Sequence, residues 1–267
     1  MSSLPLSPPE TATKRLRPLR LLRGLFLFTL IVFVVPVAAT AAWWALSDRP
    51  SSWSSANWGS SGTLAPASAS PDAAIYIMAA RTGGMKGALA VHSWIVIKRP
   101  NATTYERYDK VGWGSPIRTN GYPADAYWYS NPPMIVRAVI GKDAERLIPQ
   151  IDPAIASYPF SERGAYKIWP GPNSNTFVAH VLNEVPALGT VLPPNAAGRD
   201  FAEGPVSLRV ASDWRDLHFT IRGLFGFAIG QRSGIEIHFM GAVAGVDLMR
   251  PALKIPALGR IGFDNST

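Results

Sequence analysis

The sequence of 267 residues contains no cysteine. Disulfide bonds, thiolate nucleophiles and cysteine-ligated metal sites are therefore excluded. Charge is also scarce, because only 16% of the residues are charged while 47% are hydrophobic, which is typical of a globular chain and not of a disordered one. A chain of this length can form one domain with a sizeable core or two small ones.

Several functional motifs are missing as well. The glycine-containing stretch RTGGMKG at 81–87 lacks the spacing and the Lys-Ser/Thr ending of a phosphate-binding loop. The G-x-S-x-G pattern does not occur, so the nucleophile elbow of an α/β-hydrolase is not supported. The four histidines have no Asp or Glu grouped around them at ligand spacing, so we expect neither a metal nor another cofactor.

Basic charge is unevenly distributed. Residues 1–23 hold five basic side chains against one acid and so supply +4 of the net +8. No stripe of Lys and Arg interleaved with aromatic residues follows them, and we expect no nucleic-acid partner.

Residues 24–46, GLFLFTLIVFVVPVAATAAWWAL, form an uncharged run long enough to cross the roughly 30 Å hydrocarbon core of a membrane. The basic flank predicts that 1–23 is cytoplasmic and that the rest lies outside the bacterial inner membrane, in the periplasm. The small residues 39–41 would also fit a signal-peptide cleavage site. The apolar run continues through Trp43 and Trp44, however, which favours a retained single-pass anchor.

Residues 47–71 contain nine serines without periodicity and are interpreted as a flexible linker. Two tryptophans, Trp53 and Trp58, are unusual in such a segment, and we expect them to rest on the membrane surface or on the domain. Residues 72–267 are then one extracytoplasmic domain.

The domain has an α+β pattern, and we predict a mostly antiparallel sheet packed with a few helices. The strand patterns lie at 73–80, 87–100, 104–111, 134–141, 204–214, 216–230 and 234–248. Helical spacing occurs at 144–151, with Pro149 as a break or kink, and again at 177–185. The tail 250–263, with two prolines, is expected to be an irregular cover over the core.

Two polar residues stand out against these patterns. His92 lies in the middle of an otherwise apolar strand, where a histidine is either a satisfied core residue or a base that points into a cleft. Ser174 stands between two asparagines at the start of the second helix, where it could be a helix cap or a nucleophile beside free backbone N–H groups.

Together these residues resemble the circularly permuted papain-like fold, which includes NlpC-type cell-wall amidases and lecithin–retinol acyltransferases. In that fold a histidine strand comes first, and the nucleophile follows in an Asn-Cys-x-x-Phe motif at a helix start. Asn173, Ser174 and Phe177 align with this motif, and His92 followed by an aromatic residue aligns with the histidine strand. The likeness covers about 92–185.

The domain from residue 73 to the C terminus also resembles an uncharacterised bacterial, membrane-anchored family known only as a domain of unknown function. The segments WPGPNSNTFVAHV and GIEIHFMG carry this likeness.

The papain-like resemblance implies a nucleophile, a base and a third polar residue on the strand after His92. Ser174 replaces the cysteine, and a serine must lose its proton to a base during attack. We expect His92 Nε2 to act as that base, Asn173 to shape the turn, and Glu106 or Tyr108 to orient the histidine ring.

Two functions are consistent with this pattern. The first is a membrane-tethered hydrolase or acyltransferase that acts on an amide or ester of a cell-wall peptide or a lipid. Its oxyanion donor would be the backbone N–H of Ser174 or Asn175. The second is an inactive envelope protein that binds a ligand, with the aromatic segments 112–116 and 126–133 lining a groove.

Overall fold

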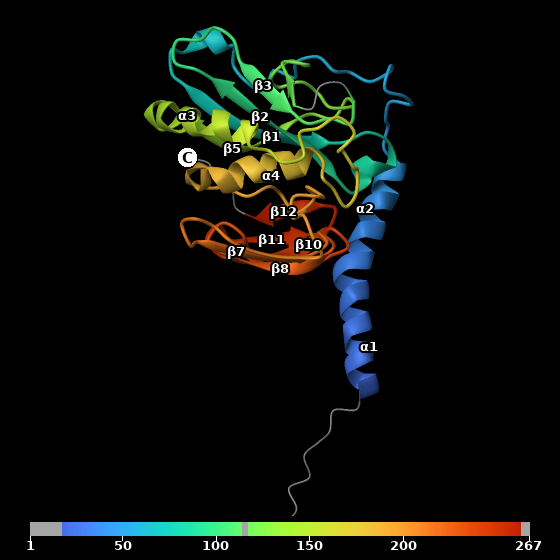
Figure 1. Ribbon diagram of the computed structural model, residues 1–267. Helices are drawn as coiled ribbons and strands as arrows, with labels where there is room; N and C mark the ends of the chain where they lie inside the picture. Colours follow the sequence, from blue (N-terminus) through green and yellow to red (C-terminus); the bar gives the residue numbers. More distant parts are fainter. Residues whose placement is uncertain (1–17, 114–116, 263–267) are drawn as a thin grey trace, which may run out of the picture.

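The computed structural model describes residues 18–113 and 117–262, and its fold is α+β. Two antiparallel sheets lie above one another with helix α4 (Ser174–Glu184) between them (Figure 1). The segment that resembles the papain-like fold, about 92–185, includes most of the upper sheet and α4. The candidate site lies between these two elements.

The upper sheet has five strands in the order β4-β3-β2-β1-β5. Their bounds are β1 Ala74–Arg81, β2 Val91–Lys98, β3 Glu106–Asp109, β4 Arg118–Thr119 and β5 Met134–Ile140. The first part of the strand predicted at 87–100 is instead the end of a 3₁₀ turn, η3 (Gly84–Ala88). Helix α3 (Lys142–Ala156) continues through Pro149, so of the two predicted alternatives at this residue, a break or a kink, the break is wrong.

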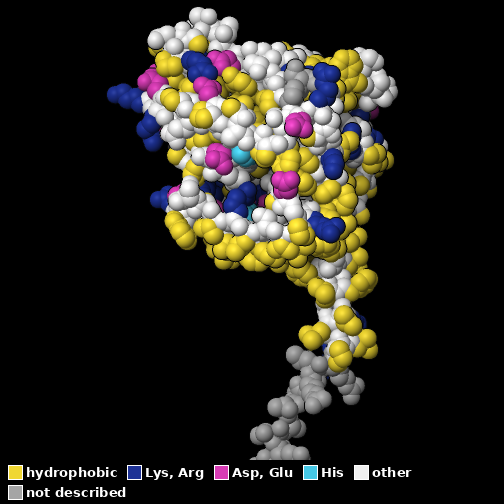
Figure 2. All heavy atoms as spheres, in the orientation of Figure 1, with side chains coloured by type: hydrophobic (Ala, Val, Ile, Leu, Met, Phe, Trp, Pro, Cys, Tyr) yellow, Lys and Arg dark blue, Asp and Glu magenta, His cyan; other side chains and the backbone are white. Residues whose placement is uncertain are grey.

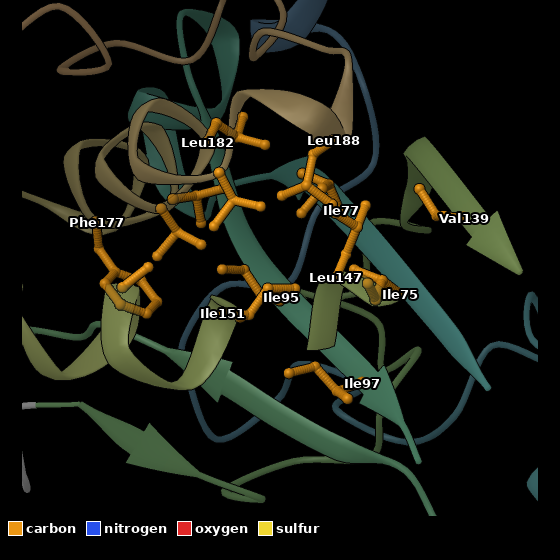
Figure 3. Close-up of a cluster of buried hydrophobic side chains, with 14 of the residues drawn as sticks. Ile75, Ile77, Ile95, Ile97, Val139, Leu147, Ile151, Phe177, Leu182 and Leu188 are labelled. Carbon is orange, nitrogen blue, oxygen red and sulfur yellow. The ribbon is translucent and has the colours of Figure 1, made fainter. Parts of the chain in front are cut away.

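The inner strand β2 of this sheet is buried on both faces. The odd-numbered face of β2 packs with β1, α3 and α4 into the main core, whose members include Ile95, Ile97 and Phe177 (Figure 3). On the opposite face Trp94 and Val96 belong to a second, aromatic-rich cluster. This strand is buried at all eight positions, which explains its nearly continuous apolar sequence.

Residues 47–71 were predicted to be a flexible linker, but part of this segment packs on the domain. Ser60 pairs with Ala126, and Asp125 accepts hydrogen bonds from Ser60 Oγ (2.7 Å) and the backbone N–H of Leu64 (3.2 Å). The indole of Trp58 joins the second cluster by packing on the rings of aromatic residues, namely Tyr122, Trp128 and Tyr129. One short turn, η2 (Ala67–Ala69), follows. Burial of the large apolar surface of Trp58 attaches this segment to the domain, although its serine-rich composition is typical of a flexible linker.

The N-terminal helix is continuous from Pro18 to Ala45 and, in the described part of the chain, it is the one helix long and apolar enough to cross a membrane. It consists of α1 (Pro18–Thr29), a π-helical turn η1 (Leu30–Val34) and α2 (Val35–Ala45). Most of the basic tail 1–23 lies outside the described residues.

The far end of this helix is attached to the upper half of the domain. Trp44 Nε1 donates a hydrogen bond to the carbonyl oxygen of Gly84 (2.8 Å), and the Arg81 guanidinium lies 5.5 and 5.6 Å from the rings of Trp43 and Trp44. A Cβ on Gly87 would come within 2.4 Å of the Trp44 ring, so the indole lies directly against η3.

The lower sheet has seven strands in the order β12-β11-β10-β9-β8-β7-β6. Their bounds are β6 Val206–Val210, β7 Asp216–Ile221, β8 Phe225–Gly230, β9 Gly234–Phe239, β10 Ala242–Asp247, β11 Ala252–Ile255 and β12 Gly259–Gly262. A 3₁₀ turn, η4 (Pro186–Leu188), lies between α4 and this sheet in the sequence.

The tail was predicted to be irregular, and this was wrong, since β11 and β12 extend the lower sheet. Pro251 immediately precedes β11 and Pro256 immediately follows it. The prolines therefore bound the strand and remove no hydrogen bond from its interior.

The face of the lower sheet that points toward α4 is polar. Glu236, 1% exposed, accepts charged hydrogen bonds from Arg199 and Lys254 and another from His238 Nε2 (3.1 Å). Burial would raise the pKa of Glu236, but the charge of Arg199, the hydrogen bond from His238 and the charge of Lys254 lower it to about 2. The space between the sheets therefore contains a buried charge network beside the apolar core of the upper sheet.

Candidate active site

A cavity of about 350 Å³ lies where the C-terminal side of η3, the start of β2 and the start of α4 meet. His92 and Ser174 both line it, as do Asn173 and Asn175. The remaining lining residues include several aromatic ones: Trp113, Trp128, Tyr129 and Tyr166. Both aromatic segments that were expected to line a groove, 112–116 and 126–133, thus contribute to this cavity. Residues 114–116 lie outside the described part.

The start of α4 is capped by Asn173. Its side-chain oxygen accepts the backbone N–H groups of Asn175 (2.9 Å) and Thr176 (3.2 Å), and Thr176 Oγ1 accepts the backbone N–H of Asn173 (3.0 Å). This is a reciprocal capping box. Ser174 is therefore the first helical residue and its hydroxyl is not needed for capping.

Asn175 attaches this helix start to β2 on both sides of His92. Its Oδ1 accepts a hydrogen bond from Ser93 Oγ (2.8 Å), and its Nδ2 donates to the carbonyl oxygen of Val91 (2.9 Å). All these groups are buried. The side chain next to Ser174 is thereby bound to the two neighbours of His92, and this arrangement brings the two residues to one cavity.

The His92 ring is fixed by two contacts. Its Nε2 lies 3.4 Å from Asp109 Oδ2, and its face stacks on Trp128 with ring centroids 3.7 Å apart and an interplanar angle of 4°. Burial lowers the pKa of His92, and the interaction with Asp109 opposes this without reversing it. The ring is therefore neutral at neutral pH, as a general base must be.

Asp109 is fully buried and lies between cations. Its carboxylate accepts hydrogen bonds from Arg107 (3.1 Å) and Arg118 (3.2 Å). Burial by itself would raise the pKa of Asp109, but the hydrogen bond with His92 and the charge of Arg107 hold it well below its usual range. Burial also lowers the pKa of Arg107 to about 10, and its guanidinium lies 4.1 Å from the centre of the Trp94 ring.

Glu106, the residue expected to orient His92, is placed elsewhere. The register pairs Ile97 with Glu106, so Glu106 belongs to the opposite face of the sheet from His92. It binds Arg99 (2.8 Å) and accepts a hydrogen bond from the hydroxyl of Tyr108 (2.7 Å). The structure thus brings His92, Asn173 and Ser174 together and replaces Glu106 by Asp109.

Sequence reasoning missed Asp109 because it could not give the register between β2 and β3. A usable signal was present in the alternation of β3. Glu106 and Tyr108 share one face, and Arg107 and Asp109 share the other, so one known pair would have identified the carboxylate beside His92.

Tyr166 was also missed. It lines the cavity with Ser174, and its interaction with the side chain and backbone of Ser174 opposes the rise in its pKa that burial causes. Within residues 18–113 and 117–262 no hydrogen bond joins Ser174 to His92. The expected Nε2 contact is made with Asp109 instead, which leaves Nδ1 as the ring nitrogen available to the cavity.

No group of three or more side chains suited to a metal ion occurs in the part of the chain that the structure describes. Two side chains face one cavity, the Ser174 hydroxyl at a helix start and the neutral His92 imidazole, and the imidazole is held from behind by the buried carboxylate of Asp109. These groups can support acid–base and nucleophilic chemistry.

Comparison with known proteins gives one family. Residues 72–201 match the family described as "Protein of unknown function (DUF3750)". This range contains β1 to α4 and every residue of the site, and it ends before the lower sheet begins. No curated protein and no solved structure matches the chain.

Proposed function

Through residues 72–201 this chain belongs to a family whose function is unknown, and we propose from the geometry of the site that it is a membrane-tethered hydrolase or acyltransferase. The observation that carries the proposal is the joint presentation of Ser174 and of the Asp109-bound His92 to one cavity.

In the proposed reaction Ser174 Oγ attacks the carbonyl carbon of an amide or ester. His92 Nδ1 accepts the serine proton as the new C–O bond forms, and it returns the proton to the leaving amine or alcohol as the bond to the leaving group breaks. Water or an acceptor alcohol then releases the acyl group by the reverse sequence. Asp109 holds the ring through Nε2 and stabilises the imidazolium.

The oxyanion donor is the backbone N–H of Ser174. The N–H of Asn175, the other candidate, is already used by the Asn173 cap. Tyr166 interacts with the backbone of Ser174, so the substrate carbonyl oxygen would take the place of the Tyr166 hydroxyl when it binds.

The surroundings of the cavity favour a substrate at the cell envelope. Lys86 in η3 lines the cavity, and Trp44 at the end of the apolar helix is bound to the same turn. With that helix in the inner membrane and the domain in the periplasm, the cavity lies near the membrane surface. Cell-wall peptides and lipids carry amide and ester bonds there.

The direct test treats the full chain in detergent with a fluorophosphonate probe at pH 7.5. We expect covalent labelling of the wild type and its loss in Ser174→Ala and in His92→Ala. Because neutral His92 is the base and its pKa lies below 6.5, labelling should fall as the pH drops below about 6.5. Equal labelling of the wild type and Ser174→Ala would refute the nucleophile assignment.

A second test uses the absence of native cysteine. Ser174→Cys creates a single thiol at a helix start, and a neighbouring His92 should lower the pKa of this thiol below the usual value of about 8.5. The alkylation rate against pH should therefore reach half its maximum at a lower pH than in the exposed control Ser68→Cys. Adding His92→Ala to Ser174→Cys should remove most of the difference.

One observation favours the second candidate function, ligand binding without turnover. No hydrogen bond joins Ser174 to His92 in the described part of the chain, and Ser174 interacts with Tyr166 instead, so the histidine does not activate the hydroxyl in this arrangement. An ordinary thiol pKa in Ser174→Cys, together with an unlabelled wild type, is the result expected for such a binding protein.

A further inference from the structure

The outward face of the lower sheet is apolar over its whole width. Its side chains form three rows across the strands: Val206–Ile221–Phe225–Phe239–Ala242, Leu208–Phe219–Phe227–Ile237–Ala244 and Val210–Leu217–Ile229–Ile235–Val246–Leu253–Ile261. Leu208 is 64% exposed and Ile237 is 46% exposed. Figure 2 shows the resulting band of hydrophobic side chains along the underside of the domain.

The burial pattern of this sheet is opposite to the usual one in a water-soluble protein, where apolar side chains face inward and polar ones face outward. In β9 the buried residues are Gly234, Glu236 and His238, while Ile235 and Ile237 are exposed. Contiguous apolar faces of this kind are rare on surfaces that contact only water, and they mark contacts with protein or membrane.

The N-terminal helix lies against the same face. The Phe33 ring packs on that of Phe239, a member of the first row, with centroids 5.3 Å apart. The helix then continues past the sheet, so that α1 extends beyond the apolar face on its outward side (Figure 1).

The length of α1 places the sheet relative to a membrane. The 12 residues of α1 span about 18 Å, which is shorter than the hydrocarbon core of roughly 30 Å. The helix can cross the core only if η1 and the first turns of α2 are also within it. Because η1 contacts β10, the outward face of the lower sheet must then lie at the depth of the acyl chains.

We propose that the lower sheet is immersed in the periplasmic leaflet of the bilayer, with lipid acyl chains covering its outward face. This inference rests on the membrane-anchor part of the proposed function and is independent of the catalytic part. Two exposed tryptophans lie at the edges of the sheet, as is typical of side chains at a membrane interface. Trp214 precedes β7 and is 84% exposed, and Trp169 donates a hydrogen bond to the carbonyl oxygen of Met240 in the β9–β10 turn.

A second copy of the chain fits this face poorly. Two domains stacked through their outward faces would direct their α1 helices in opposite directions, since each α1 projects beyond its own sheet toward the other copy. Both helices could not then cross one membrane with the same orientation. Lipid can cover the apolar face and still allow every copy of the helix to cross the membrane in the same orientation.

The test reads the depth of single labelled cysteines in the full chain, reconstituted at high lipid-to-protein ratio in phosphatidylcholine–phosphatidylglycerol vesicles. An environment-sensitive fluorophore is attached at Ile237→Cys on the sheet, at Phe28→Cys on α1 and at the exposed Gln150→Cys on α3. Leu208→Cys provides an independent second position on the same row as Ile237.

We expect lipids with spin labels on their acyl chains to quench the label at 237, 208 and 28. Aqueous iodide should quench it several-fold more weakly at these positions than at 150. Quenching by lipid at 28 combined with strong iodide quenching at 237 and 208 would overturn the immersed sheet and leave the anchor standing. Strong iodide quenching at all four positions would overturn the anchor as well. Protection at 237 and 208 from both quenchers would mean that protein covers the face, which also refutes the proposal.

Discussion

The two sheets of this protein bury opposite kinds of side chain. In the five-stranded sheet, Ile95 and Ile97 point into the core beside α4, and Arg107 and Asp109 lie on the other face. In the seven-stranded sheet, Glu236 and Lys254 point inward while Ile235 and Ile237 point outward. β9 of the lower sheet alternates between buried and exposed residues, whereas β2 of the upper sheet is buried throughout. A strand pattern can therefore separate two faces without stating which one is inside.

The largest effect is expected at Glu236, which tests whether the buried charges on the inner face of the lower sheet stabilise the fold. Its replacement by alanine leaves Lys254 buried without its carboxylate and Arg199 with Asp200 alone, and we expect the free energy of unfolding to fall by about 3–5 kcal/mol. Denaturant unfolding of the full chain in detergent measures the loss. The exposed Glu203→Ala serves as the control and should change little. A loss at Glu236 no larger than at Glu203 would mean that the inner network does not support the fold.

An isoleucine-to-alanine substitution in each sheet compares the inward face of the upper sheet with the outward face of the lower sheet. Ile95→Ala, at a position with no exposed surface, should lower the free energy of unfolding by about 2–5 kcal/mol through lost burial and a cavity. Ile237→Ala, at a position 46% exposed, should cost less than about 1 kcal/mol in detergent, because its neighbours on the outward face are solvent or detergent molecules. Similar losses in the two variants would show that the faces do not differ as described.

The smallest effect on stability is expected for Ser174→Ala at the start of α4, between the two sheets. Asn173→Ala removes the acceptor of two backbone N–H groups and should cost about 1 kcal/mol, up to 2. Ser174→Ala leaves the capping box in place and should leave the unfolding midpoint nearly unchanged while abolishing probe labelling. A Ser174→Ala variant as unstable as Asn173→Ala would indicate that the serine is structural.

Much of the fold could be predicted from local patterns. The membrane-length helix, the strand around His92 and the helix that begins at Ser174 all follow from periodicity and turn residues that act over a few positions. The α+β class follows from the order of these segments.

The parts that escaped prediction depend on contacts between distant residues. Asp109 reaches His92 only through the register of two strands, and Trp58 turns a serine-rich segment into part of the aromatic cluster. The strand β11 forms because it pairs with β10, although two prolines lie at its ends. None of these contacts has a signature within a single stretch of sequence.

The hydrogen bond between Trp44 and Gly84 has a consequence for how the cavity would meet its substrate. It joins the end of the apolar helix to the turn that carries Lys86, so the opening is held at one height relative to that helix. With the proposed function, a site held in this way would meet its substrate by diffusion within the plane of the membrane and not through the bulk solution. Its encounter rate would follow the lateral diffusion and surface density of lipid-linked molecules, and it would change little with the bulk concentration of free ones.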